Sequence, residues 1–185
     1  MAMLGIFLIF NMNSYLTHVL GINAKILIYT TVVLHTVIMP LIAVFILQKT
    51  GSISSLKLNS LQERRIPYLF TAIMYFICYH TLQLYSIPSP IYTFILGAGI
   101  AIGITSALNF IFKISAHGVG IGGITGMIFS LGNLLQTEII HFLVISIILI
   151  GIVGFSRLKL NAHSPIQFYS GVFLGFFCIY LTFNH

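Results

Sequence analysis

Long apolar runs, almost free of charge, restrict what this chain can fold into. A helix that crosses a bilayer needs roughly 20 mostly apolar residues. Five runs reach that length with at most one charge each: residues 24–48, 66–86, 90–112, 138–156 and 164–183. Residues 118–135 are slightly short but uncharged, and residues 2–20 are weaker because polar side chains interrupt them. The sequence therefore predicts six or seven transmembrane helices.

The charge content excludes an ordinary soluble domain. Of the 185 residues, 58% are hydrophobic and only 5% are charged, whereas a soluble domain has about 25% charged residues. In water such a chain would expose very large apolar patches, whereas apolar surface that faces lipid carries no free-energy penalty. We therefore expect an all-α integral membrane protein that forms a single transmembrane domain over residues 1–185.

The basic residues gather on one side of the membrane if successive helices alternate in direction. Seven of the eight lie there and only Lys25 lies opposite. The seven are Lys49, Lys57, Arg64, Arg65, Lys113, Arg157 and Lys159. The positive-inside rule makes this side cytoplasmic, as in a multi-pass protein of a bacterial inner membrane. Cations that bind phosphate are poor topology markers, so the side that a site would face stays open.

Prolines and glycines mark turns and helix contacts. Pro88 and Pro90 predict a tight hairpin, and Ser164 with Gln167 forms a capping-box pattern at a helix start. Pro40 lies inside a long apolar run and predicts a kink in that helix. Glycines four residues apart predict close helix packing rather than a dinucleotide-binding loop, because no strand precedes them: Gly118/Gly122, Gly122/Gly126 and Gly171/Gly175.

Three clusters of polar residues fall on the basic side, where a helix bundle can bring them together. They are Lys57, Arg64 and Arg65; Ser115 and His117; and Arg157, His163 and Gln167. Arginine offers forked donors to phosphate oxygens and lysine offers a point charge. One histidine can attack phosphorus while a second protonates the leaving oxygen. The clusters therefore contain the residue types that phosphoryl transfer requires.

The order and spacing of these clusters resemble the signature of the type 2 phosphatidic acid phosphatase superfamily, which shares its pocket with vanadate-dependent haloperoxidases. That signature reads Lys, six residues, Arg-Pro; then Pro-Ser-Gly-His; then Ser-Arg, five residues, His, three residues, Asp. The likeness covers about residues 57–167 and is most specific between Ser156 and Gln167. Members of the family usually have six helices, and residues 66–112 would add a hairpin between the first two clusters.

The resemblance implies a phosphatase for membrane lipid phosphates or diphosphates that uses neither metal nor cofactor and binds no nucleic acid. His163 would be the nucleophile that forms a phosphohistidine, and His117 would be the general acid. The substrate would be a polyprenyl diphosphate, phosphatidic acid or a similar lipid of the bilayer. The family's phosphate-binding positions fall on Lys57, Arg64, Ser115 and Arg157.

Two departures from the signature bear on function. Arg64 is followed by Arg65 and Ile66 before Pro67, so either arginine could take the phosphate-binding role. The final family Asp is Gln167, whose amide oxygen can accept the same hydrogen bond but brings no charge. In serine proteases the comparable Asp-to-Asn change costs about 10⁴ in rate. The alternative is therefore a catalytically impaired membrane protein that binds or transports lipid headgroups.

Overall fold

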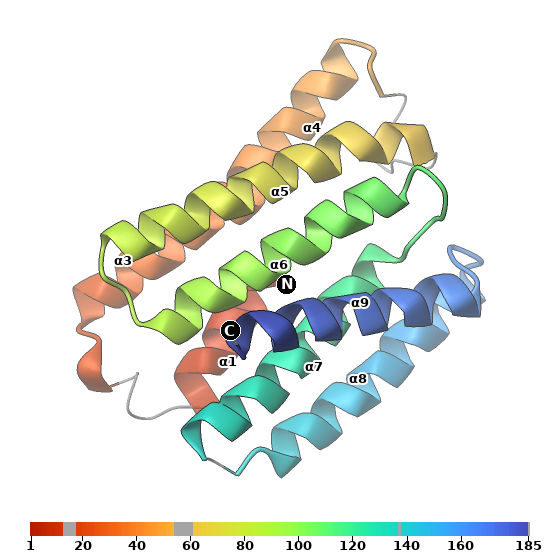
Figure 1. Ribbon diagram of the computed structural model, residues 1–185. Coiled ribbons are helices and arrows are strands. Elements are labelled where there is room, and N and C mark those ends of the chain that lie inside the picture. Colours follow the sequence, from red (N-terminus) through yellow and green to blue (C-terminus); the bar gives the residue numbers. More distant parts are fainter. Residues whose placement is uncertain (13–17, 54–60, 137, 185) are drawn as a thin grey trace.

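The apolar runs fold as long helices that pack side by side in a bundle (Figure 1). The structure, a computed structural model, describes residues 1–12, 18–53, 61–136 and 138–184. Within these ranges the regular elements are all helices, and five of them are long and apolar enough to cross a membrane. The prediction of an all-α membrane bundle is confirmed.

Six long rods and one short helix make up the described ranges. The first rod joins α3 (Ile22–Val33), the π-helical turn η1 (Leu34–Ile38) and α4 (Met39–Lys49). The other rods are α5 (Leu61–Leu84), α6 (Ser89–Leu108), α7 (Ala116–Leu135), α8 (Ile140–Lys159) and α9 (Pro165–Phe183). Helix α5 has 24 residues but is not among the five apolar spans, because charged side chains at its start and polar ones such as His80 and Gln83 near its end lower its hydropathy.

The short helix α1 (Ala2–Met12) has 11 residues. At 1.5 Å per residue it extends roughly 16 Å, which is about half of the ~30 Å thickness of the hydrocarbon layer. With the six rods, it gives seven helical segments in the described residues, in keeping with the predicted six or seven.

Successive rods alternate in direction, as the charge distribution requires. The ends of α4, α6 and α8 and the starts of α5, α7 and α9 meet at one end of the bundle, on the right of Figure 1. We call this the basic end, because it carries all the described Lys and Arg residues except Lys25. The three polar clusters belong to this end, and Lys57 lies outside the described residues.

Helices α7 and α9 approach each other closely because glycines line their contact. A Cβ atom added to Gly118 would lie 2.5 Å from the carbonyl oxygen of Phe168, and one on Gly126 would lie 2.6 Å from that of Phe176. From the other side, a Cβ on Gly171 would lie 2.7 Å from the carbonyl oxygen of Ser115. The predicted close packing is confirmed, and it holds the starts of the two helices together.

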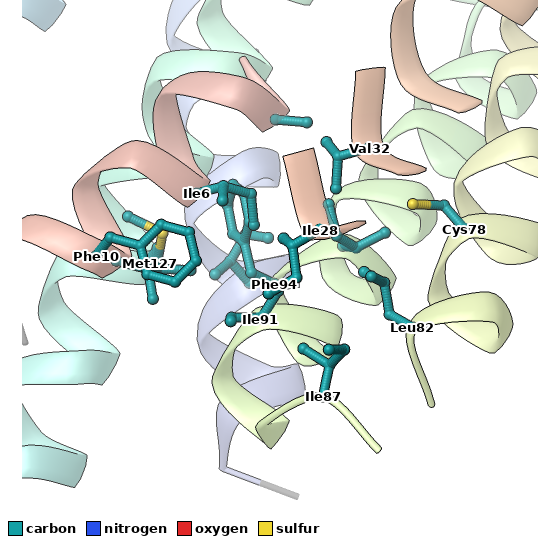
Figure 2. Close-up of a cluster of buried hydrophobic side chains, with 14 of the residues drawn as sticks. Ile6, Phe10, Ile28, Val32, Cys78, Leu82, Ile87, Ile91, Phe94 and Met127 are labelled. Atoms are coloured by element: carbon teal, nitrogen blue, oxygen red, sulfur yellow. The ribbon is translucent and has the colours of Figure 1, made fainter. Parts of the chain in front are cut away.

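A second contact region joins α1, α3, α5, α6 and α7 through buried apolar side chains (Figure 2). Phe94 of α6 is only 2% exposed and lies among Ile6 of α1, Ile28 of α3 and Met127 of α7. Because lipid is as apolar as these side chains, close packing rather than exclusion of water stabilises such contacts in a membrane. This cluster fastens the α5–α6 hairpin to the rest of the bundle.

Both proline predictions have a structural counterpart. Helix α5 ends at Leu84 and α6 begins at Ser89, so residues 85–88 form the predicted hairpin turn, with Pro88 as the N-cap of α6 and Pro90 in its first turn. The π-helical turn η1 lies directly before Pro40. A proline lacks an N–H and its ring crowds the carbonyl group four residues earlier, and the wider π turn accommodates both effects within a continuous rod.

Replacing Gly122 with alanine is expected to lower the midpoint of thermal unfolding in detergent. The added methyl group would strike the carbonyl oxygen of Val172 on α9, and overpacking of this kind costs about 1–3 kcal/mol. The matched control is Gly151→Ala on α8, where no atom lies within 4 Å of the added Cβ. Equal midpoints for the two variants would show that the glycines do not determine the α7–α9 distance.

Candidate functional site

The backbone ties the start of α7 to the start of α9. The Ser115 N–H donates a hydrogen bond to the carbonyl oxygen of Gln167, at 3.0 Å. The fully buried Ser115 hydroxyl caps α7 by accepting from the Gly118 N–H, at 3.3 Å. A hydroxyl that accepts one hydrogen bond keeps its own proton for another acceptor. The second and third polar clusters therefore lie against each other.

The first turn of α9 forms the predicted capping box. The side-chain oxygen Oε1 of Gln167 accepts from the Ser164 N–H at 3.2 Å, and the Ser164 hydroxyl accepts from the Gln167 N–H at 3.3 Å. A backbone N–H can only donate, so the atom of Gln167 that faces it is the amide oxygen. The orientation of the Gln167 amide group is thereby fixed.

The same Gln167 oxygen lies 3.3 Å from Nδ1 of His163. Because an amide oxygen only accepts, Nδ1 carries the proton in this hydrogen bond. The neutral imidazole of His163 then has an unprotonated Nε2 with a free lone pair. The geometry therefore selects the tautomer of His163 that is protonated at Nδ1.

Lys113 links the segment before α7 to the loop before α9. Its Nζ donates to the carbonyl oxygen of Ala162 at 3.2 Å, next to His163. The sequence placed Lys113 on the basic side but gave it no role in the site, because it belongs to none of the three clusters. The only signal was its position two residues before Ser115.

Positive charges act on both histidines. Arg157 and Arg64 act electrostatically on His117, and Lys113 and Arg64 act on His163. Arg64 is therefore common to the two histidines, which also act on each other. Burial, followed by these charges, holds the pKa of His163 below its usual value of 6.5, while the hydrogen bond with Gln167 acts in the opposite direction.

The two adjacent arginines take different positions. The guanidinium carbon of Arg65 lies 4.0 Å from the centre of the Phe110 ring, and its carbonyl oxygen accepts from the Ser106 hydroxyl at 3.1 Å. Arg65 thus supports the contact between the start of α5 and the end of α6. Between the two alternatives left by the sequence, Arg64 is the arginine whose charge acts on the histidines.

Helix dipoles add to the positive potential. Helices α7 and α9 both begin at the basic end, next to Ser115 and Ser164. The first N–H groups of a helix and the positive end of its dipole favour anions. Two helix starts, two arginines and a lysine around a pair of histidines form a site suited to an anion.

Some polar atoms at this end are buried and have no hydrogen-bond partner in the described part of the protein. They are Nε of Arg65, Nε of Arg157 and both amide atoms of Asn109, a residue with no exposed surface. Buried polar atoms without a partner cost free energy. No motif or spacing in the sequence distinguishes Asn109, which ends α6.

Comparison of the chain with protein-family models, with curated proteins and with solved structures found no match in any of the three. The site is therefore interpreted from its own residues and geometry.

Replacing Lys113 with glutamine is expected to raise the pKa of His163, because the substitution removes a positive charge that disfavours protonation of the imidazole. The neutral imidazole reacts with diethyl pyrocarbonate, so the pH midpoint of His163 modification, followed by mass spectrometry, should move to higher pH. The control is Lys159→Gln, whose ammonium lies over the Phe155 ring. Identical midpoints in both variants would contradict the arrangement.

Proposed function

We propose that this chain is a lipid phosphate phosphatase that hydrolyses a phosphomonoester or diphosphate of a membrane lipid in a bacterial inner membrane. One observation carries the proposal: Nδ1 of His163 faces the oxygen of Gln167, and the charges of Lys113, Arg64 and His117 act on the ring. A phosphohistidine mechanism needs a histidine of fixed tautomer beside cations and a second proton-transferring group.

In the first step, Nε2 of His163 attacks phosphorus. An N–P bond forms and the P–O bond to the lipid breaks, so the electron pair leaves with the lipid oxygen. The negative charge of the bound phosphate would offset Arg157 and Arg64, so that His117 takes up a proton in the complex. Protonated His117 gives that proton to the lipid oxygen, and the lipid alcohol or monophosphate departs. The lowered pKa of His163 keeps its attacking nitrogen unprotonated at neutral pH.

In the second step, water hydrolyses the phosphohistidine. The now neutral His117 accepts a proton from the water molecule while the water oxygen attacks phosphorus. The N–P bond breaks, inorganic phosphate leaves and His163 regains its starting form. This exchange of acid and base roles uses the same pair of residues in both steps.

The cations stabilise the charge that spreads over the phosphoryl oxygens. The charges of Arg157 and Arg64 act on His117. Ser115 at the start of α7 is fully buried, so its hydroxyl would donate to a phosphate oxygen only if the bound lipid displaces the residues that cover it. Preorganised donors of this kind supply much of the rate in phosphoryl transfer. According to the family resemblance, Lys57 would complete the set of phosphate-binding cations. Arg65 would support the site through its contact with the Phe110 ring.

Purified protein is expected to release inorganic phosphate from at least one member of a panel containing polyprenyl diphosphates, phosphatidic acid and phosphatidylglycerol phosphate. His163→Ala should lower that rate by at least about a hundredfold, because it removes the attacking nitrogen. His141→Ala is the matched control, since His141 is exposed near the opposite end of α8. No release by the wild type, with no difference in His163→Ala, would refute the enzymatic proposal.

A second function, binding or transport of lipid headgroups without turnover, is favoured by the uncharged Gln167. Its oxygen is shared between the Ser164 N–H and His163 and gives no negative charge to an imidazolium. A binder would still retain vanadate at the cations, with binding lost in Arg157→Ala, but would release no phosphate. The release panel therefore separates the two functions.

Adding a negative charge at Gln167 is expected to raise turnover by roughly tenfold or more, the reverse of the loss caused by an Asp-to-Asn change in a catalytic triad. Gln167→Glu keeps the side-chain length and the capping oxygen, whereas Gln167→Asp introduces the residue of the resembled family. The measurement is kcat for the best substrate of the panel. An unchanged or lower kcat in both variants would show that the uncharged amide of Gln167 does not limit turnover.

A further inference from the structure

A partly open cavity of about 260 Å³ lies among α1, α5, α6, α7 and α9. Most of its lining is apolar, and its wall includes three aromatic rings and several alanines. The residues that matter here are Tyr68, Tyr75, Phe94, Ala98, Ala101 and Ala116.

Three of the four hydroxyl groups in the wall have a partner within the protein, and the fourth belongs to Tyr68. Thr71 donates to the carbonyl oxygen of Pro67 and Thr105 to that of Ala101, both at 2.7 Å within their own helices. Tyr75 lies within reach of a side-chain hydrogen bond with Thr36 on η1. The cavity therefore presents mainly methyl groups and ring faces, and such cavities prefer apolar ligands to water.

One end of the cavity adjoins the candidate site. Ala116 lies in the chain between Ser115 and His117, and Tyr68 lies one helical turn beyond Arg64, whose charge acts on it. From Thr105 the wall continues along α6 to Phe94, which is buried in the core cluster of Figure 2. Eleven helical residues correspond to roughly 16 Å, so the cavity leads from the cations into the apolar interior.

We propose that this cavity holds one apolar chain of the phosphorylated lipid while its phosphate lies at Arg64, His117 and His163; the inference rests on the proposed function. An amphiphile with one charged end and one long apolar end matches a cationic cluster continuous with an apolar cavity. The volume is below the ~300–1,000 Å³ of common ligand pockets, so it suits a single slim chain. A lipid with two chains would leave the second in the bilayer.

The test uses full-length protein in lipid nanodiscs and single-chain phosphate esters of increasing length, from butyl to dodecyl phosphate, with farnesyl phosphate as the prenyl counterpart. For the wild type, kcat/KM should rise with chain length. Ala98→Leu narrows the cavity and should lower kcat/KM about tenfold or more for dodecyl and farnesyl phosphate, while butyl phosphate is hydrolysed as before. Comparison of the two long esters shows whether an alkyl or a prenyl chain fits better.

Ala107→Leu is the matched control, because Ala107 lies on the same helix but is exposed on its outer face. It should leave the rates for all esters unchanged. The cavity proposal is overturned if wild-type rates do not depend on chain length, or if Ala98→Leu keeps the full advantage of long esters.

A binding measurement separates this proposal from the proposed function. Dodecyl phosphate should raise the thermal midpoint of the wild type more than that of Ala98→Leu. If no ester is hydrolysed but this difference persists, the phosphatase proposal fails and the cavity remains a chain-binding site. If hydrolysis occurs but the midpoints rise equally, the cavity proposal fails alone.

Discussion

The close contact between α7 and α9 is the constraint on which the site depends. Glycines at Gly118, Gly171 and neighbouring positions let the two backbones approach until their main chains touch. Only at that distance can the Ser115 N–H reach the carbonyl oxygen of Gln167. This hydrogen bond brings the start of one helix, with His117, to the start of the other, with His163, although 46 residues separate the two histidines in the chain.

Much of the fold was predictable because a membrane allows few solutions. A backbone in lipid must satisfy its own hydrogen bonds, so each long apolar run becomes a helix. Pro88 and Pro90 fixed one turn, and Ser164 with Gln167 fixed one helix start. The first run was harder to interpret, since polar side chains interrupt it, and its described helix α1 covers residues 2–12 alone.

The site was predictable in composition but not in detail. Spacing identified the two histidines and the cations, and strict alternation of helices put them at one end. The sequence could not decide between Arg64 and Arg65, because their separation depends on how α5 is rotated against Phe110. The sequence gave no role to Lys113 or Asn109. The hydrogen bond of Lys113 to Ala162 and the complete burial of Asn109 arise only from tertiary packing.

The single oxygen of Gln167 makes the reactivity of His163 depend on an event usually regarded as purely local, the fraying of a helix end. When the first turn of α9 opens, Ser164 loses its capping partner and the Gln167 amide turns freely, so the imidazole proton can move from Nδ1 to Nε2. A helix cap contributes about 1 kcal/mol, which amounts to roughly a fivefold bias toward the closed turn. The population of the Nδ1-protonated tautomer is thus tied to secondary-structure stability at one helix terminus, and temperature or lipid conditions that loosen this turn would change the tautomer while the bundle stays intact.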